Sequence, residues 1–461
     1  MAINFTGNTI FGIDATANGD LWITKIQEYV TNVGYGFDFV TFTDVSYAVE
    51  GSVYAVPQID NPFEDGDAVH SETARNNVYV RATGTLWGED DGVDFDTGAD
   101  DNVLVNEGSV IGRDDTAVDI FGKRVTVENL GTLEGGKDGI YASGEDVYIY
   151  NSGTILGLED AGIDDLSNGG RVVNHGIING QVTGVFTESG ADGIVILNTG
   201  HISGGLVGIQ SNTLSADTLV LRNSGTIAAG DPGGRSFLGV SGDETVINEG
   251  LMLGNVQLGD GADTYRGVGL GEVDDGIFGE TGNDLLVGSD ASDKLFGEAD
   301  NDTLTGGGGA DSLFGGGDND TLRGGEGDDV VNGGAGVDIL FGGSGDDEII
   351  GGLNRDIMRG NGGQDVFVFQ SVNDSLTTAG NTDVIIGFER GVDVIDLDGL
   401  SAGDLTFIGT AGFSGTADEL RAVQLANGTM SVQVDTDGDM TADFRLFLRN
   451  IDTVDANDFI L

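Results

Sequence analysis

Cysteine is absent from this chain of 461 residues, and histidine occurs only three times. Without a thiol, the chain has no disulfide framework, no zinc–thiolate site and no cysteine nucleophile. If such a protein works outside the cell, it must be stabilised in another way, and bound cations would serve. The three histidines, His70, His175 and His201, do not stand in the H-E-x-x-H spacing of a zinc protease.

Basic residues are scarce, since 19 Lys and Arg face 78 Asp and Glu, for a formal net charge of -59. Binding of nucleic acid through its phosphates requires Lys and Arg, so the sequence excludes that function. The same charge argues against docking on an anionic membrane, and no apolar run is long enough for membrane insertion. The first residues lack the basic and apolar segments of a secretory signal, so we expect a cytosolic protein or export by another route.

Proline is rare, with 3 residues, whereas glycine is abundant, with 82. The hydrophobic content of 38% is low, but it exceeds that of a disordered chain. High glycine with little proline favours turn-dense β structure, and the length allows about two to four domains.

A nine-residue pattern repeats without a slip between residues 279 and 369, and Gly333–Phe341 is a clear copy. Each copy holds a leading glycine, an aspartate five residues later and an apolar residue two further on. The aspartates are Asp284, Asp293, Asp302, Asp311, Asp320, Asp329, Asp338, Asp347, Asp356 and Asp365. The leading glycines run from Gly279 to Gly360 and include Gly306, Gly315, Gly324, Gly333, Gly342 and Gly351. Non-glycine residues occupy the fourth position in four copies, at Ala291, Asp300, Asp318 and Asn354, and predict either a weaker site or an added ligand.

The glycine-rich part of each copy predicts a loop, and its last three residues predict a short strand with one inward side chain. Two copies per turn would give strands on opposite faces, with aspartates eighteen residues apart stacked on one edge. Aspartate carboxylates and loop carbonyls, including those of the leading glycines, are the oxygen ligands that Ca²⁺ prefers. The alternative is a flexible Gly-Asp linker, but ten copies in phase disfavour it. The pattern resembles the RTX nonapeptide, which forms a calcium-binding parallel β-roll.

Calcium also bears on location, because extracellular calcium modules bind with dissociation constants of about 10⁻⁴ to 10⁻³ M. In a cytosol with little free calcium, the acidic repeats would repel one another and stay open. Outside the cell, metal binding and folding would become one event. We therefore expect an extracellular protein that takes up several Ca²⁺ ions after export.

A second, longer repeat over residues 77–265 centres on Asn-x-Gly followed by small or apolar residues. Its asparagines are Asn106, Asn129, Asn151, Asn174, Asn198, Asn223 and Asn248. A second apolar segment, such as Val118–Ile120, lies between successive copies. A period in the twenties with several short strands predicts a right-handed parallel β-helix of about eight rungs. Asparagine suits a left-handed turn, its stacked amides can hydrogen-bond between rungs, and the glycine would allow a tight bend.

This portion resembles the passenger-type β-helices of secreted bacterial surface proteins, a likeness that implies fold rather than activity. Residues 1–76 predict a mostly β cap for the first rung, with strands at Phe37–Phe42 and Ser52–Val56. A helix over Trp22–Val30 is the alternative there. The segment Leu258–Tyr265 looks like an isolated nonapeptide copy that starts the calcium coil.

Residues 371–461 hold a distinct series that includes Asp383–Phe388, Gly391–Leu397 and the terminal Asp458–Leu461. This series resembles the C-terminal domain of serralysin-type secreted metalloproteases. The resemblance implies calcium coils, the type I secretion machinery as a partner, and an uncleaved export signal at the C-terminus. The protease domain of that family carries H-E-x-x-H, which this chain lacks, so we reject a zinc protease. A second candidate calcium loop consists of Asp435, Asp437, Asp439 and Asp443, although a plain acidic turn is favoured there.

The sequence thus predicts an all-β chain: a cap, a parallel β-helix, a calcium-binding parallel β-roll over 266–370 and a C-terminal β module. We predict a secreted, non-enzymatic, adhesin-like binding or structural protein, with extracellular glycans or the cell surface as candidate partners, and we assign no catalytic residue. The alternative is a polysaccharide-acting enzyme, an epimerase or lyase that uses the β-helix. For that we would expect clustered Arg or Lys with a base, whereas Arg113, Lys123, Arg124 and Lys137 are scattered. The paired aspartates Asp164-Asp165 and Asp114-Asp115 and the pair His175 and His201 are weak candidates for acid–base chemistry.

Overall fold

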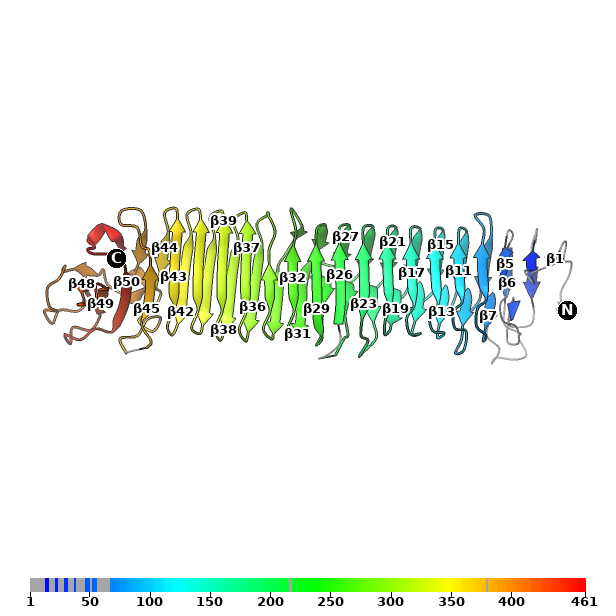
Figure 1. The fold of residues 1–461 in the computed structure, drawn as a ribbon, viewed down its shortest axis with the longest axis horizontal. Coiled ribbons are helices and arrows are strands. Elements are labelled where there is room, and N and C mark those ends of the chain that lie inside the picture. The colour runs from blue at the N-terminus through cyan, green and yellow to red at the C-terminus, as the bar shows by residue number, and fades with distance from the viewer. Residues whose placement is uncertain are drawn as a thin grey trace. The chain divides into compact units, whose positions relative to one another are not determined.

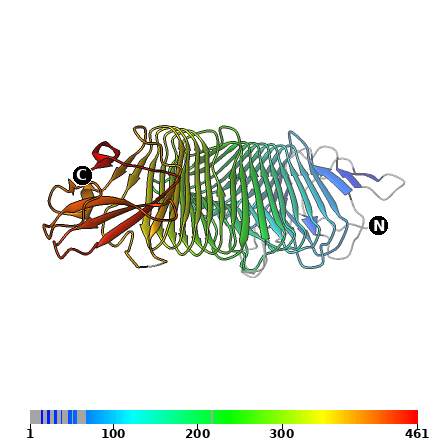
Figure 2. The ribbon, with the colours of Figure 1, turned by 60° about the vertical axis from the view of Figure 1, so that its left-hand side comes forward.

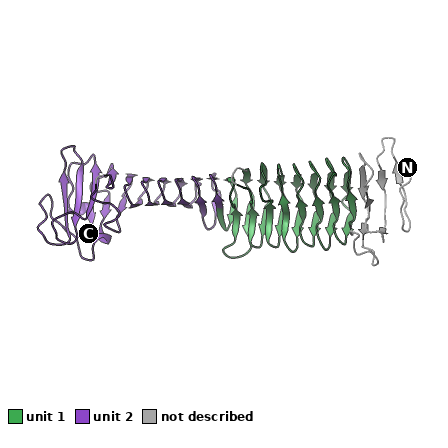
Figure 3. Cartoon of the chain, turned by 90° about the horizontal axis from the view of Figure 1, so that it is seen from below, with its two compact units in different colours: residues 1–257 green, residues 258–461 purple. Residues whose placement is uncertain are grey.

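The computed structural model describes residues 67–214, 218–378 and 380–461, together with the backbone of six strands between residues 13 and 55. The chain divides into two compact units, residues 1–257 and 258–461 (Figure 3). Leu258–Tyr265 belongs to the second unit, while the four domain limits derived from the sequence stay a prediction. Within the described residues, the helices are too short or too polar to cross a bilayer.

Unit 1 is a parallel β-helix whose described rungs each contain three short strands (Figures 1 and 2). The strands of the first sheet are β8 (Asn77–Val80), β11 (Val103–Asn106), β14 (Thr126–Asn129), β17 (Tyr148–Asn151), β20 (Arg171–Asn174), β23 (Ile194–Asn198), β26 (Thr218–Asn223) and β29 (Asp243–Asn248). Those of the second sheet are β9 (Thr85–Gly88), β12 (Ser109–Gly112), β15 (Thr132–Gly135), β18 (Thr154–Gly157), β21 (Ile177–Gly180), β24 (His201–Gly204), β27 (Thr226–Ala229) and β30 (Leu251–Leu253). Those of the third sheet are β7 (Val69–Ser71), β10 (Val93–Phe95), β13 (Val118–Ile120), β16 (Ile140–Ala142), β19 (Ala161–Leu166), β22 (Thr183–Thr187), β25 (Val207–Gln210), β28 (Arg235–Leu238) and β31 (Asn255–Asp260). The prediction of a parallel β-helix, with strands at the Asn-x-Gly units and at the apolar segments between them, is confirmed.

Each Asn-x-Gly unit forms the turn between the first and second sheets. The buried asparagines hydrogen-bond from rung to rung, as Asn129 Nδ2 does to Asn151 Oδ1 at 2.8 Å. The same amide bond joins every consecutive pair from Asn106 to Asn248. The predicted amide stacking is therefore confirmed, but the predicted left-handed turn is wrong, since none of these asparagines has a positive φ.

The glycine of the turn is required by close approach and not by its backbone angle. A Cβ on Gly131 would collide with the carbonyl oxygen of Gly108 in the preceding turn, and Gly131 is not among the glycines with positive φ. This close approach is a requirement for glycine that the predicted tight bend did not include. Inward Val, Ile and Leu fill the interior, as the fully buried Leu104, Val127 and Ile149 show. Their burial accounts for most of the stabilisation of the rungs.

The strands before residue 67 are β1 (Ile13–Ala15), β2 (Leu21–Ile23), β3 (Tyr29–Thr31), β4 (Phe37–Asp38), β5 (Ser46–Val49) and β6 (Ser52–Ala55). Three of them extend the sheets, since β5 pairs with β8, β6 with β9 and β4 with β7, all parallel. The alternative helix over Trp22–Val30 is wrong at both of its ends, where β2 and β3 lie. The rest of the predicted cap lies outside the described residues.

Unit 2 begins as a parallel β-roll with two strands per turn. The strands of one sheet are β32 (Thr264–Gly267), β35 (Leu285–Val287), β37 (Thr303–Gly308), β39 (Thr321–Glu326), β41 (Ile339–Ser344) and β43 (Ile357–Gly362). Those of the other are β34 (Ile277–Thr281), β36 (Lys294–Ala299), β38 (Ser312–Gly317), β40 (Val330–Ala335), β42 (Glu348–Leu353) and β44 (Val366–Val368), and β33 (Glu272–Val273) precedes them. Leu304 pairs with Leu322, so the register advances by two nonapeptides per turn, as predicted. The apolar residue of each copy, from Leu286 to Phe367, is fully buried between the sheets.

The C-terminal module continues both sheets and adds an antiparallel segment. Its elements are β45 (Asp383–Ile386), β46 (Val394–Asp396), η1 (Asp398–Leu400), β47 (Thr406–Phe407), β48 (Glu419–Gln424), β49 (Met430–Asp435), β50 (Phe444–Arg449), η2 (Ala456–Asp458) and β51 (Phe459–Ile460). The strand β43 pairs with β45 and β44 with β46, and the terminal β51 lies parallel to β46. The end of the chain is therefore part of the fold.

Candidate metal centres

The repeat aspartates of unit 2 form two buried ladders, one on each edge of the roll. The backbone N–H of Asp302 donates to Oδ1 of Asp320 at 2.8 Å, and Asp320 N–H donates to Asp338 in the same way. One ladder contains Asp263, Asp284, Asp302, Asp320, Asp338, Asp356 and Asp383. The other contains Asp293, Asp311, Asp329, Asp347, Asp365 and Asp393. All ten predicted aspartates are brought into these two stacks.

Three ladder members were not among the ten predicted ligands because their spacing is not nine residues, although one of them, Asp263, lies in the isolated copy Leu258–Tyr265. Asp263 precedes Asp284 in the first ladder, while Asp383 and Asp393 end the two ladders inside the C-terminal module. Asp383 and Asp393 are each followed two residues later by a buried isoleucine, Ile385 or Ile395. That Asp-x-apolar triplet is the signal that could have found them without the leading glycine.

The second carboxylate oxygen, Oδ2, is buried and has no hydrogen-bond partner in most ladder members. These members are Asp284, Asp302, Asp311, Asp320, Asp329, Asp338, Asp347, Asp356, Asp365 and Asp383. A buried carboxylate oxygen without a partner is strongly unfavourable when the group is ionised. Burial accordingly raises the pKa of Asp320 to about 7 and that of Asp302 to about 8. The ladder carboxylates would therefore be stabilised by a bound cation or by protonation.

The leading glycines bring the two predicted kinds of ligand together. A Cβ on Gly333 would lie 2.5 Å from Oδ2 of Asp338 and 2.7 Å from the carbonyl oxygen of Gly351. No side chain can replace this glycine, and both oxygens lie beside the same Cα. The same arrangement surrounds Gly306, Gly315 and Gly324, whereas the atoms nearest to Gly342, Gly351 and Gly360 belong to the aspartate alone. Oxygen-only donors on glycine-rich loops fit Ca²⁺, so these residues would hold that cation.

The loops between strands use left-handed backbone at their second and fourth positions. Gly325 and Gly327 have φ of 128° and 122°. Asp318 and Asn354 replace glycine at the fourth position and keep φ of 68° and 85°, which Asp and Asn tolerate better than other residues. These substitutions, and Asp300 with φ of 75°, therefore preserve the loop geometry.

One copy departs from this geometry. In Gly288–Phe296, neither Ser289 nor Ala291 has a positive φ. The backbone N–H and Oγ of Ser289 donate to Oδ2 of Asp293 at 2.6 and 3.0 Å. Ser289 thus supplies the hydrogen-bond donors that Oδ2 lacks in the other copies. A bound cation would therefore stabilise Asp293 less than it stabilises the other ladder aspartates.

The C-terminal half of the chain matches a known family. The model of the family described as peptidase M10 serralysin C terminal matches residues 236–461. These residues are therefore similar to the C-terminal domain of serralysins. Two similar solved structures are the AlgE6R2 and AlgE6R3 subunits of the mannuronan C5-epimerase of Azotobacter vinelandii, each 24% identical to this chain. The matches cover 38% of this chain and 91% and 80% of theirs, with TM-scores of 0.21 and 0.17, and no curated protein matches the chain.

The acidic loop between β49 and β50 of the C-terminal module brings together three of its four predicted ligands. Carboxylate oxygens of Asp435, Asp437 and Asp443 lie within 4.8 Å of one another, and Asp439 is not part of this group. Both oxygens of Asp435 accept backbone N–H groups, and Oδ2 of Asp443 accepts from Thr436. These hydrogen bonds account for the loop as an acidic turn, so we propose no ion there.

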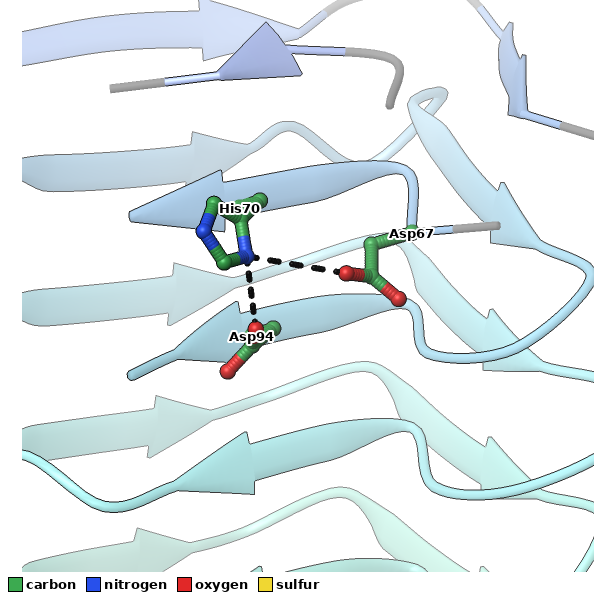
Figure 4. Close-up of side chains that lie close together, drawn as sticks. All are labelled: Asp67, His70 and Asp94. Carbon is green, nitrogen blue, oxygen red and sulfur yellow. Dashed lines mark hydrogen bonds and ion pairs between the residues drawn. The ribbon is translucent and has the colours of Figure 1, made fainter. Parts of the chain in front are cut away.

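The β-helix of unit 1 holds a different cluster around His70, which the sequence alone did not indicate (Figure 4). His70 lies on β7, and its register partner on β10 is Asp94. His70 Nδ1 lies 2.6 Å from Asp94 Oδ2 and 3.7 Å from Asp67 Oδ2. Nε2 lies 3.6 Å from the carboxylate of Glu72, so acidic groups face both ring nitrogens. The exposed fractions of the His70, Asp67 and Asp94 side chains are only 6%, 2% and 13%.

The surroundings of His70 are strongly acidic. Burial alone would lower the pKa of His70, but the hydrogen bonds to Asp67 and Asp94 outweigh it and raise this pKa to about 11. Burial and the charges of Asp67 and Asp119 raise the pKa of Asp91 to about 9. The register continues from Asp94 to Asp119, Tyr141 and Asp164 on the next three strands, which gives the third sheet an outward row of ionisable side chains.

The weaker acid–base candidates do not assemble into a site. His175 donates to or accepts from Thr199 Oγ1 at 2.5 Å and packs against Tyr150, with ring centroids 5.5 Å apart. His201 lies on β24, opposite Ile177 and Thr226. Asp164 belongs to a group with Asp138 and Asp160, whereas Asp114 makes only an exposed ion pair with Arg113. These contacts account for His175 as a packing residue.

Proposed function

We propose that this chain is a secreted calcium-binding protein whose β-roll is completed by Ca²⁺ after export. The supporting observation is the set of buried Oδ2 atoms without partners, repeated along both aspartate ladders. Ca²⁺ ions would neutralise these carboxylates with help from the carbonyls of the leading glycines. The ions supply charge compensation, and the chain supplies the fixed oxygens and the turns that hold them.

Calcium titration of the full chain tests this proposal. Starting from chelated protein, added Ca²⁺ should increase the β signal in far-ultraviolet circular dichroism and bind with more than one ion per chain in calorimetry. Mg²⁺ should act far more weakly, because it demands tight octahedral geometry and releases water reluctantly. An unchanged spectrum and no heat of binding would reject the calcium model.

Export through a type I system is the second part of the proposal, and it rests on the family of the C-terminal domain. The terminal β51 pairs with β46, and Arg390 forms ion pairs with Asp455 and Asp458 that fasten this end. In the folded protein the proposed export signal is therefore engaged, whereas a calcium-free chain would present it. Localisation outside the cell follows if the export proposal holds.

For the β-helix we propose a non-enzymatic binding or structural role. Several of its basic side chains form exposed ion pairs between neighbouring rungs, as in Arg113–Glu89, Lys123–Glu145 and Arg124–Asp101. Within the described rungs, these paired side chains do not form a cluster of free positive charge for an anionic polysaccharide. Extracellular glycans of low charge or a cell surface would be the partners of such a face.

The row of ionisable side chains on the third sheet favours the alternative, a polysaccharide-acting enzyme, because carboxylates in line could serve as acid and base. A screen of calcium-loaded protein against acidic and neutral polysaccharides separates the two functions. Ultraviolet absorbance would detect unsaturated uronates, and proton NMR would detect epimerised ones. Turnover of any of them would replace the non-enzymatic proposal.

A further inference from the structure

We propose that His70, Asp67 and Asp94 form a site for one divalent transition-metal ion at the first described rungs of the β-helix. This site is separate from the calcium ladders of unit 2 and involves none of their residues. The candidate ligand atoms are His70 Nδ1, Asp67 Oδ2 and Asp94 Oδ2. Figure 4 shows the three side chains converging from the strand β7, the turn before it and the neighbouring strand β10.

The geometry suits a small cation. The three atoms lie within 4.8 Å of one another, and the two distances from Nδ1 are 2.6 and 3.7 Å. Two ligands that each lie about 2.1 Å from a tetrahedral metal are separated by about 3.4 Å. The observed distances of 2.6 and 3.7 Å lie on either side of that value, so small side-chain rotations, which move the ligand atoms by less than about 1 Å, would bring both distances to it.

An independent observation comes from the charge of the cluster. Asp94 Oδ1 and Asp119 Oδ1 are buried without a hydrogen-bond partner. Among the described residues, no ion pair joins Asp91, Asp94 or Asp119 to a lysine or arginine. One imidazole therefore faces several carboxylates, and a divalent cation would supply the missing positive charge.

The donor set identifies the class of metal. One imidazole nitrogen with two carboxylate oxygens suits Zn²⁺, Mn²⁺ or Co²⁺, whereas Ca²⁺ prefers oxygen donors alone. When the metal binds, it displaces the proton that His70 Nδ1 and Asp94 Oδ2 share, and that proton passes to solvent. Three protein ligands leave one position for water.

Binding would tie neighbouring rungs together. His70 and Asp94 belong to paired strands, and Asp67 lies in the turn that leads into β7, where its Oδ1 also accepts from Asp91 N–H at 3.2 Å. The metal would cross-link these backbone segments of two neighbouring rungs. We therefore expect metal binding to raise the melting temperature of the β-helix.

The experiment uses the full chain with Ca²⁺ in excess, so that the β-roll sites are filled before Co²⁺ is added. The chain has only three histidines, so three imidazole signals appear in proton–nitrogen NMR. Substoichiometric Co²⁺ should broaden one of them, and the variants His175→Ala and His201→Ala assign the other two. One equivalent of Co²⁺ should give a visible absorption band in the wild type and in both control variants.

His70→Ala should weaken Co²⁺ binding at least about tenfold, because loss of a metal's supporting partners alone has that effect. Asp94→Asn keeps the side-chain volume and should weaken binding similarly, while Glu72→Gln, on the other ring nitrogen, should not. Failure of Co²⁺ to broaden the His70 signal in the wild type would overturn the site, whatever the variants do. Equal affinity of His70→Ala and wild type would do so as well. Neither result would bear on calcium binding by unit 2.

Discussion

The aspartate ladders predict that the metal-free β-roll is destabilised as the pH rises. The pKa of Asp320 is about 7 in the folded roll, against about 3.9 in an unfolded chain. Ionising this one carboxylate inside the roll at neutral pH therefore costs about 4 kcal/mol, at about 1.4 kcal/mol per pKa unit. Two such groups already match the roughly 5–15 kcal/mol that stabilises a whole domain. Burial raises several further ladder pKa values, with Asp338 at about 6 and Asp302 at about 8.

The sign follows from proton counting. Below about pH 4 the carboxylates are protonated in both states, so they cause no penalty. Between about pH 4 and 8 the folded roll binds more protons than the unfolded chain, so its stability falls as the pH rises. Above that window the full penalty is present. Calcium removes it by taking the place of the protons.

Hydrogen exchange measures this prediction directly, with rates corrected for the intrinsic effect of pH. The ladder N–H groups of Asp302 and Asp320 should be protected with Ca²⁺ at about pH 7.5, lose protection with chelator, and regain part of it with chelator at about pH 4.5. The turns around Asn151 in unit 1 provide an internal control, because their ladder is made of neutral amides. Protection that survives the chelator at neutral pH, or that is weaker in acid, would refute the reasoning.

Three further outcomes are expected. Asp293→Asn should lower the calcium affinity less than Asp320→Asn, because Ser289 already donates two hydrogen bonds to Asp293. The double variant Ser289→Gly, Ala291→Gly should bind one more calcium ion in calorimetry, whereas the control Ser344→Gly should not. An unchanged stoichiometry of the double variant would contradict the account of this copy. Asn174→Ala removes one hydrogen-bond partner from each of the amides of Asn151 and Asn198, and it should lower the free energy of unfolding by about 2–5 kcal/mol in urea titration. The control Asn179→Ala, at an exposed position, should change this free energy by less than about 0.5 kcal/mol. Equal effects of the two variants would show that the amide ladder contributes little. Deletion of residues 450–461 should abolish export by a reconstituted type I system, and normal secretion of the truncated chain would refute the export proposal.

The repeats of unit 2 could be predicted almost completely, because every residue of a nonapeptide has one environment and the period never slips. Leu304 and Leu322 are buried as expected, and their aspartates stack on one edge. What escaped prediction lies where the period breaks. Asp383 and Asp393 continue the ladders after intervals that admit a loop, and the hydrogen bonds of Ser289 depend on backbone angles that a substitution pattern does not reveal.

In unit 1 the sequence predicted the rungs and their amide ladder, but not the reason for the glycines. Asn129 is needed for its amide partner in the next rung, and Gly131 is needed because the preceding turn lies where its Cβ would be. The His70 cluster could not be foreseen from local spacing, since His70 and Asp94 meet only through the register of two strands. The available signal was the pair of triplets Val69–Ser71 and Val93–Phe95, which are the two preceding copies of the apolar segment Val118–Ile120.

The aspartate ladders also have a polarity. Each backbone N–H points to a carboxylate that the chain supplies one turn later, never one turn earlier. A roll shortened from its beginning would expose a carboxylate, whereas a roll shortened from its end would leave the last N–H groups to water in place of an aspartate. Asp383 and Asp393 provide the last acceptors from outside the regular repeat. The C-terminal module therefore completes both ladders, and each turn of the roll obtains its acceptor from a segment that is synthesised after it.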